Sequence, residues 1–135
     1  MCSYFEFHDS VLAAVVDDVA RCIVELRPAY VHRSAGIPGV DAGEGFWQDL
    51  AITIECAKMK MPQLELPTDI GDGYLSVGDI RMANLAPTQL REEKKVLLKI
   101  VTMVDGTEID IEGTSIEIRT IGEAVFAESF PGTPK

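Results

Sequence analysis

The chain has 135 residues, 47% of them hydrophobic, which suits one soluble domain with a continuous apolar core. Its formal charge of −10 argues against nucleic-acid binding, because an acidic surface repels the phosphate backbone. No apolar run approaches the roughly 18 residues of a membrane-spanning helix. The N-terminus lacks the basic start of a secretory signal or transit peptide, so we expect a cytoplasmic protein that does not bind membranes.

The three cysteines, Cys2, Cys22 and Cys56, show no CxxC spacing. An odd number of thiols without that spacing is typical of free cysteines in a reducing compartment. We therefore expect no disulfide, metal ion or cofactor. Cys22 and Cys56 fall on the apolar faces of expected strands, where cysteine acts as a small hydrophobic residue.

Residues 11–26 fit two structures. As a helix, they place apolar side chains at spacings of three and four, with Ser10 as the N-cap and Pro28 just beyond the end. As a hairpin, they alternate apolar and polar residues on either side of a turn at Asp17-Asp18. The many β-branched residues in this segment favour strands only modestly.

Residues 33–46 are rich in glycine and predict about 14 residues without regular structure. Long loops in compact domains often carry function. Phe46 and Trp47, the only tryptophan, come at the end of this segment. An aromatic residue there could anchor a partner, but we favour a role in closing one end of the core.

Four shorter segments complete the middle of the chain. Leu50, Ile52, Ile54 and Cys56 alternate with other residues as in a strand with one buried face. Two short strands are expected over residues 74–77 and 80–83, joined by a turn at Gly78-Asp79. Residues 88–95 fit one helical turn or a wide loop equally well.

Residues 94–120 predict a three-stranded antiparallel meander. Alternating apolar residues up to Val104 are followed by Asp105-Gly106, a dipeptide that suits a type I′ hairpin turn. Apolar residues then alternate with acidic ones, and Gly113 separates the second strand from the third. We interpret the acidic residues as a solvated face rather than as the carboxylate pair of a glycosidase. They are Glu108, Asp110, Glu112 and Glu117.

These patterns together predict a mainly β fold. We expect a single domain over residues 1–130, built as an antiparallel β-sandwich or open barrel of about eight strands with at most one short helix. A loose tail is expected at residues 131–135.

Several polar residues could carry chemistry. His8, Asp9 and Ser10 are adjacent, and adjacent strand side chains point to opposite faces, so these three residues are not expected to form a catalytic triad. We expect Asp9 or Ser10 to hydrogen-bond the backbone where the first strand begins. His8 and His32 could bind a divalent metal with Asp9 or Asp41, but no metal-ligand spacing is present and structural roles are favoured. The candidate binding residues are His8, Asp9, Tyr30, His32, Arg33, Asp41, Trp47 and Asp49.

The opening FEFHDS, residues 5–10, resembles the start of a group of small uncharacterised bacterial β-rich proteins. In that group an F-H-D-S or F-H-D-A motif leads into a first strand and hairpin. The run RPAYVHR at residues 27–33, and the segments at 39–41 and 47–49, are similar to the later part of the same pattern. Some proteins with a similar opening are classed as immunity proteins of bacterial toxin systems. The resemblance implies a hairpin over residues 11–26 and a non-enzymatic role.

We therefore expect a non-catalytic interaction domain, of the immunity type, whose acidic surface binds a basic protein partner. The alternative is a small-molecule or metal-binding β-barrel with residues 33–46 as its lid and an apolar pocket near Tyr30, His32 and Trp47. An enzyme using His8, Asp9 and His32 is the least favoured hypothesis. The sequence leaves a homodimer open.

Overall fold

A computed structural model describes residues 2–34, 36–37, 41–55 and 57–131. The described residues form twelve antiparallel strands and no helix, and so contain no helix that could span a membrane. All the strands belong to one hydrogen-bonded sheet that does not close into a barrel. The predicted mainly β, antiparallel fold is confirmed, with twelve strands rather than about eight. The strands are β1 (Cys2–Glu6), β2 (Val11–Asp18), β3 (Arg21–Ser34), β4 (Gly43–Glu55), β5 (Lys58–Lys60), β6 (Thr68–Val77), β7 (Ile80–Ala83), β8 (Leu85–Pro87), β9 (Leu90–Glu92), β10 (Val96–Thr102), β11 (Glu108–Gly113) and β12 (Ser115–Phe130).

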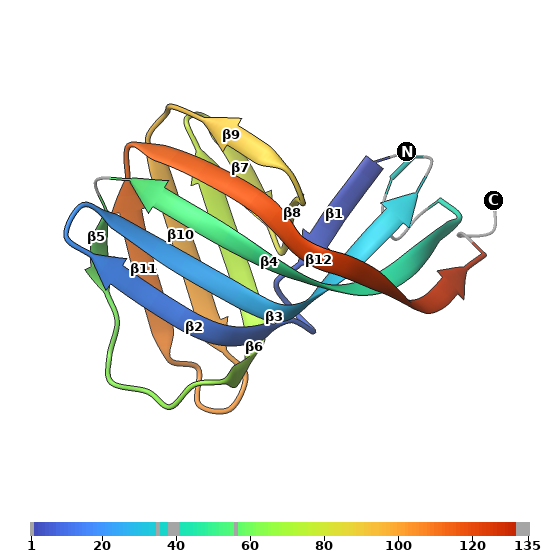
Figure 1. Cartoon of the computed structure of the whole chain (residues 1–135), viewed down its shortest axis with the longest axis horizontal. Coiled ribbons are helices and arrows are strands. Elements are labelled where there is room, and N and C mark those ends of the chain that lie inside the picture. Colours follow the sequence, from blue (N-terminus) through green and yellow to red (C-terminus); the bar gives the residue numbers. More distant parts are fainter. Residues whose placement is uncertain (1, 35, 38–40, 56, 132–135) are drawn as a thin grey trace.

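The sheet folds over so that its two halves lie one behind the other (Figure 1). The front half contains β2, β3, β4, β12 and β9, and the back half contains β6, β7, β10, β11 and β5. Each half turns alternate apolar side chains inward, and these form one buried cluster. Among its members are Val24, Ile52 and Ile54 from the front half and Leu98, Ile100, Ile109 and Ile111 from the back half.

Residues 11–26 form the hairpin of β2 and β3, the one of the two structures left open by the pattern that the resemblance favoured. Its turn lies at residues 19–20 and not at Asp17-Asp18, because those aspartates remain in β2. There Asp18 lies directly opposite Arg21, an opposite-charge pair that favours this register. Cys22 is fully buried on the inner face, as expected for a structural thiol.

The expectation of about 14 irregular residues at 33–46 was wrong. β3 continues to Ser34 and β4 begins at Gly43, so the two strands form a long hairpin with a short connection. The glycines of β4 do not form a loop. They lie within the strand and allow groups of the opposite strand to approach its backbone closely. A Cβ atom at Gly45 would lie 2.2 Å from the hydroxyl oxygen of Tyr30.

The meander was predicted only in part. β10 and β11 pair as expected, but β12 pairs with β4 and β9 in the front half. The chain crosses between the halves at Gly113, where a Cβ would lie 2.2 Å from Cγ2 of Ile54. Strand rhythm predicted the first part of β12, up to Thr120, but not its continuation to Phe130. It did not predict this crossing, because alternation does not specify which strand is the partner.

The connection between β10 and β11 is also wider than a two-residue type I′ turn. The N–H of Thr102 donates to the carbonyl of Thr107 at 2.9 Å, and residues 103–107 form the loop. Only Gly106 adopts positive φ, at 67°. Asp105 organises the loop by accepting hydrogen bonds from both threonine hydroxyls, and these bonds lower the pKa of its carboxyl group.

The other expected segments are largely confirmed. β6 and β7 meet at Gly78, which adopts a φ of 57°, and Leu50, Ile52 and Ile54 are buried in β4. Residues 88–95 contain the short strand β9, instead of a helical turn or a plain loop. Cys56 and residues 132–135, most of the expected tail, lie outside the described residues.

We call the part of the molecule in which the front and back halves pack on each other the compact end. β3, β4 and β12 continue beyond it and form an arm with β1 (Figure 1). We define the arm as residues 2–6, 29–34, 43–48 and 125–130. Pairing shifts register at its base, between Leu26 and Ala29 in β3 and between Ile121 and Val125 in β12. Pro28 lies in the first irregularity, where its missing N–H disrupts no ladder hydrogen bond. Such bulges bend strands and redirect the side chains that follow.

Candidate functional site

An aromatic cluster lies on the outer face of the arm, the face that continues the outer surface of β3, β4 and β12. Cross-strand register places Tyr30 opposite Trp47, and Trp47 opposite Val125. The Tyr30 ring makes edge contacts with the rings of His32 and Trp47, each at a centroid distance of 4.9 Å. His32 stacks on Phe130 at 5.3 Å. The aromatic cluster therefore consists of Tyr30, His32, Trp47 and Phe130.

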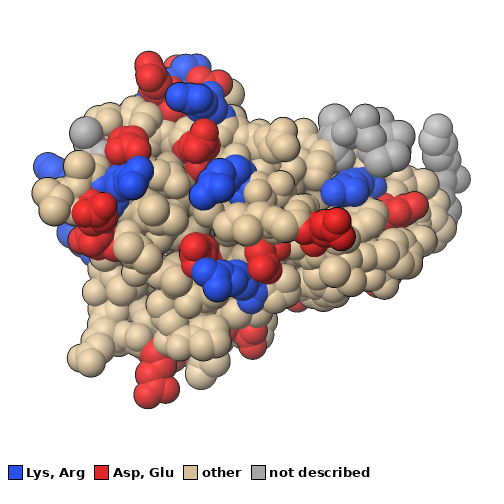
Figure 2. Space-filling view, in the orientation of Figure 1, with Lys and Arg blue, Asp and Glu red and all other residues tan. Residues whose placement is uncertain are grey.

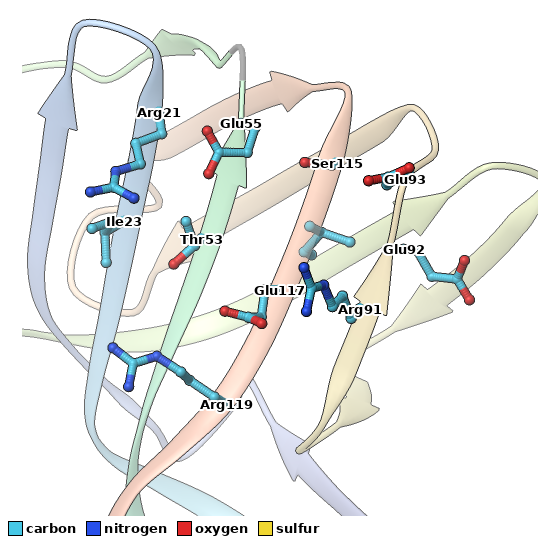
Figure 3. Close-up of a pocket in the computed structure, with 11 residues that line it drawn as sticks. Arg21, Ile23, Thr53, Glu55, Arg91, Glu92, Glu93, Ser115, Glu117 and Arg119 are labelled. Carbon is cyan, nitrogen blue, oxygen red and sulfur yellow. The ribbon is translucent and has the colours of Figure 1, made fainter.

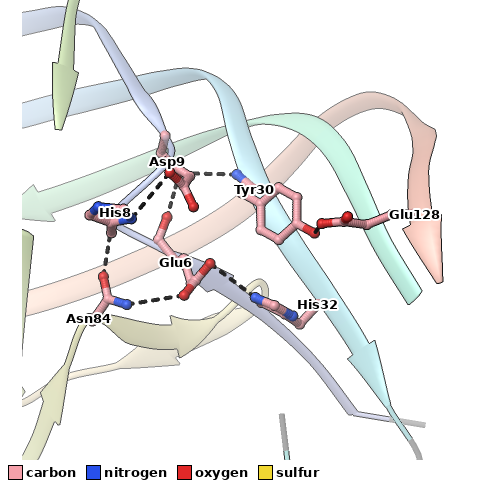
Figure 4. Close-up of polar contacts among 8 residues, drawn as sticks. Glu6, His8, Asp9, Tyr30, His32, Asn84 and Glu128 are labelled. Carbon is pink, nitrogen blue, oxygen red and sulfur yellow. Dashed lines mark hydrogen bonds and ion pairs between the residues drawn. The ribbon is translucent and has the colours of Figure 1, made fainter. Parts of the chain in front are cut away.

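Two carboxylates bind the polar groups of this cluster (Figure 4). The Tyr30 hydroxyl donates a hydrogen bond to Oε1 of Glu128. Burial, together with this carboxylate, raises the pKa of Tyr30 well above its ordinary value. Nε2 of His32 lies 3.0 Å from Oε2 of Glu6, and the Asn84 amide donates to the other oxygen of Glu6 at 3.2 Å. These contacts fix both rings in place.

The F-H-D-S segment attaches β1 to the base of the cluster. The Ser10 hydroxyl accepts the backbone N–H of Tyr30 at 3.0 Å and donates to the backbone carbonyl of Glu6. The backbone N–H of His8 donates to the Asn84 side chain at 2.8 Å. Ser10 therefore hydrogen-bonds the backbone beside the first hairpin, as predicted. Asp9 instead occupies the turn, with a φ of 72°.

The two histidines have different carboxylate partners. Nδ1 of His8 lies 3.1 Å from the neighbouring Asp9, and both side chains are about half exposed. His32 faces Glu6. Across the described part of the chain, no three side chains of His, Cys, Asp or Glu are grouped closely enough to hold a metal ion.

Phe46 and Trp47 point to opposite faces of the arm. Phe46 packs against the core, with the Arg33 guanidinium 4.3 Å above its ring and Phe126 at 5.9 Å. Trp47 lies outside the core, with 36% of its surface exposed next to Val125, which is 63% exposed. The expectation of a core-closing aromatic pair therefore holds for Phe46 and was wrong for Trp47.

The structure brings Tyr30, His32 and Trp47 into direct contact. It also places His8 and Asp9 beside them, where Asn84 bonds both the His8 backbone and Glu6 (Figure 4). Asp49 lies two positions along β4 from Trp47, on the same outer face. Arg33 occupies the opposite face, as its contact with Phe46 requires. Asp41 lies apart, and its carboxylate accepts the N–H of Ile37 within the hairpin connection.

Sequence reasoning missed Glu6, Asn84 and Glu128. Glu6 carried a usable signal, because a charged residue between the buried Phe5 and Phe7 must point to the other side of its strand. Asn84 and Glu128 reach the site through pairings more than 70 residues apart in the chain, which no local pattern shows.

A shallow polar hollow of about 490 Å³ lies on the outer surface of the compact end (Figure 3). Arg21, Arg91 and Arg119 line it together with four glutamates. Acidic and basic side chains alternate over this end of the molecule (Figure 2). None of five hollows on the described surface is lined by Tyr30, His32 or Trp47, so none of these five is the apolar pocket that the barrel hypothesis expects near those residues.

Comparisons with known proteins add no functional assignment. The chain matches no family model, no curated protein and no solved structure. Function must therefore be inferred from the geometry and chemistry of the described residues.

Proposed function

We propose that this chain is a non-catalytic interaction domain, of the immunity type, that binds a basic protein through the outer face of its arm. The observation that carries the proposal is the aromatic cluster, in which Trp47 is exposed beside the buried Tyr30 and in which Glu6 and Glu128 bind the polar groups of His32 and Tyr30. Large aromatic side chains with a polar edge are the residues that most often dominate binding energy at protein interfaces.

The cluster suits a cationic side chain from the partner. Trp47 presents an exposed ring, and the face of an indole attracts a guanidinium or ammonium group. Beside it, Glu128 uses Oε1 to bind the Tyr30 hydroxyl, and Oε2 accepts no hydrogen bond from a described residue. An arginine lying over Trp47 could therefore donate to Oε2 of Glu128.

The charge of the whole chain favours the same partner. A formal charge of −10 steers a basic protein toward the surface and speeds its association at low ionic strength. The aromatic cluster would then supply the short-range contacts that determine the lifetime of the complex. Association should therefore be sensitive to salt, and dissociation should be sensitive to Trp47.

Tryptophan fluorescence tests this proposal at the site, because Trp47 is the only tryptophan. The basic proteins encoded by genes flanking that of this chain are prepared in tryptophan-free form and titrated into it. We expect one of them to shift the Trp47 emission to shorter wavelength as the ring loses water. The affinity of that protein should fall steeply between about 50 and about 300 mM salt. Over this range the Debye length falls from above about 10 Å to below about 8 Å, so the charges of the two proteins interact less strongly.

Two variants separate the arm from general acidity. Trp47→Ala should weaken binding by about 2 kcal/mol or more, as measured by calorimetry. Glu128→Gln should weaken it too, whereas Glu44→Gln, an exposed carboxylate pointing to the other face of β4, should have little effect. The arm would be rejected as the binding surface if both glutamate variants lost the same amount of affinity, or if affinity did not change with salt concentration.

A further inference from the structure

A second hollow, of about 350 Å³, lies at the base of the arm, on the side away from the aromatic cluster. It forms where the segment between β8 and β9 approaches β1, β3, β4 and β12. The described residues that line it are Ser3, Arg33, Gln48, Thr88, Gln89 and Thr120. Its volume is in the lower part of the range for small-molecule sites.

The lining of this hollow is unlike the rest of the surface. Its described residues include one guanidinium, three hydroxyl groups and two amides, but no carboxylate. By contrast, the hollow at the compact end contains four glutamates for its three arginines. In a chain with 22 acidic residues against 12 basic ones, a polar hollow without a carboxylate is an unusual local environment.

Arg33 is oriented for binding by its contact with Phe46. Cζ of the guanidinium lies 4.3 Å from the centre of the Phe46 ring, a cation–π contact that uses none of the guanidinium's N–H donors. No carboxylate of a described residue lies within ion-pair distance of Arg33. A guanidinium without a carboxylate partner can donate two parallel hydrogen bonds to a planar carboxylate.

Neighbouring polar groups are also fixed. Gln48 and Thr88 are both buried. Nε2 of Gln48 donates to the carbonyl of Gly122 at 3.0 Å, which leaves its Oε1 as a free acceptor. The backbone N–H of Thr88 donates to the carbonyl of Ser3 at 3.2 Å, and this bond holds the segment between β8 and β9 against β1. Amides and hydroxyls held in this way match a ligand with its own hydroxyl groups.

We propose that this hollow binds a small hydroxylated carboxylic acid, with the carboxylate on Arg33 and the hydroxyl groups on the threonines and glutamines. A singly charged carboxylate fits better than a phosphate dianion, because one guanidinium must offset the ligand charge in the field of an acidic protein. The site is separate from the aromatic cluster, so a test of ligand binding here does not depend on whether the proposed protein partner exists.

Nuclear magnetic resonance of the labelled chain tests this inference directly. The side-chain amide groups of Gln48 and Gln89 report on the hollow itself. Gluconate, which carries one carboxylate and several hydroxyl groups, should shift both amide signals in a saturable way. Glucitol, which lacks the carboxylate, and inorganic phosphate should each bind at least about tenfold more weakly. No saturable shift with gluconate, or tighter binding of phosphate, would overturn the proposal.

Variants then assign the contacts. Arg33→Gln should lower gluconate affinity by about ten- to a hundredfold, since hydrogen bonds to charged groups are the strong ones. Arg33→Lys, which keeps the charge but loses the paired donors, should show an intermediate loss, and Thr120→Val a smaller one. Arg119→Gln, in the hollow at the compact end, is the matched control and should leave the affinity unchanged. If Arg33→Gln does not fold, Arg33→Lys and Thr120→Val decide, and unchanged affinity in both would overturn the assignment.

Discussion

The compact end and the arm are made largely of the same three strands, β3, β4 and β12. In the compact end, those strands pack aliphatic side chains such as Ile52 against the back half of the sheet, and acidic and basic side chains are scattered over the outer surface (Figure 2). In the arm, the outer face carries aromatic rings tied to carboxylates, and Trp47 and Val125 are exposed. Buried aliphatic side chains from both halves of the sheet therefore stabilise the compact end, and we propose recognition only for the outer face of the arm.

The largest expected effect is on the core. Ile52→Ala should lower the free energy of unfolding by about 2 to 5 kcal/mol, because it removes a fully buried side chain and leaves a cavity. Val125→Ala, in the exposed part of the arm, should change it by less than about 0.5 kcal/mol. Denaturant unfolding of both variants checks the comparison, and similar losses would contradict a division between the two regions.

The next effect is a loss of stability in alkali. Burial raises the pKa of the Cys22 thiol from 9.0 to about 11, and the nearby Asp17 adds to the shift. The folded chain therefore keeps this proton while the unfolded chain releases it, so stability is complete below pH 9 and is lost as the pH rises toward 11. The loss amounts to at most about 3 kcal/mol.

Urea unfolding between pH 8 and pH 11 measures this loss. Cys22→Ala should lower stability at every pH but flatten the decline above pH 9, because the titrating thiol is gone. Tyr30→Phe should flatten only the part above pH 10. The unfolded chain releases the Tyr30 proton near its ordinary pKa of 10.0, whereas the folded chain keeps it, so this residue lowers stability only above that pH. A decline that Cys22→Ala leaves unchanged would show that another group controls it.

A smaller effect is expected inside the arm. Gly45→Ala places a Cβ against the Tyr30 hydroxyl and should push that ring away from Glu128, at a cost of about 2 kcal/mol. The emission of Trp47, which packs on Tyr30, should change as well. Glu44→Ala is the control on the other face of β4 and should alter neither quantity. Unaltered stability and emission in Gly45→Ala would mean that the hydroxyl contact is dispensable.

The smallest effect belongs to the acidic face of β11. Lys99 lies 3.7 Å from Glu108 and 3.9 Å from Asp110, all three at least partly exposed. Lys99→Ala should cost less than about 1 kcal/mol in thermal unfolding, and high salt should abolish the difference. A loss comparable to that of Ile52→Ala would show that surface charge, and not the apolar core, stabilises the compact end.

Local pattern predicted most strands but few of their partners. The alternation around Cys22 and Ile54 correctly indicated buried faces, because period-two burial is a property of each strand alone. The crossing at Gly113 was missed, since pairing of β12 with β4 depends on contacts between residues 60 to 87 positions apart in the chain. The same limit explains why Tyr30, His32 and Trp47 were singled out while Glu128 was not.

The glycines of residues 33–46 led to the wrong prediction of an irregular segment for a different reason. Glycine is common in loops, but Gly43 and Gly45 are strand residues whose missing side chains make room for the opposite strand. A sequence pattern does not distinguish a glycine that bends the backbone from one that allows close packing.

The pairing of β4 with β12 has a consequence for how the protein is made. While residues 56–114 are being synthesised, β4 is exposed along one side, because its neighbour on that side is β12. A nascent chain would therefore present an unpaired ribbon edge bearing Phe46 and Trp47 until residues 115–130 leave the ribosome. Folding should be slow for a chain of this size, and chaperones that shield strand edges should raise its yield during translation.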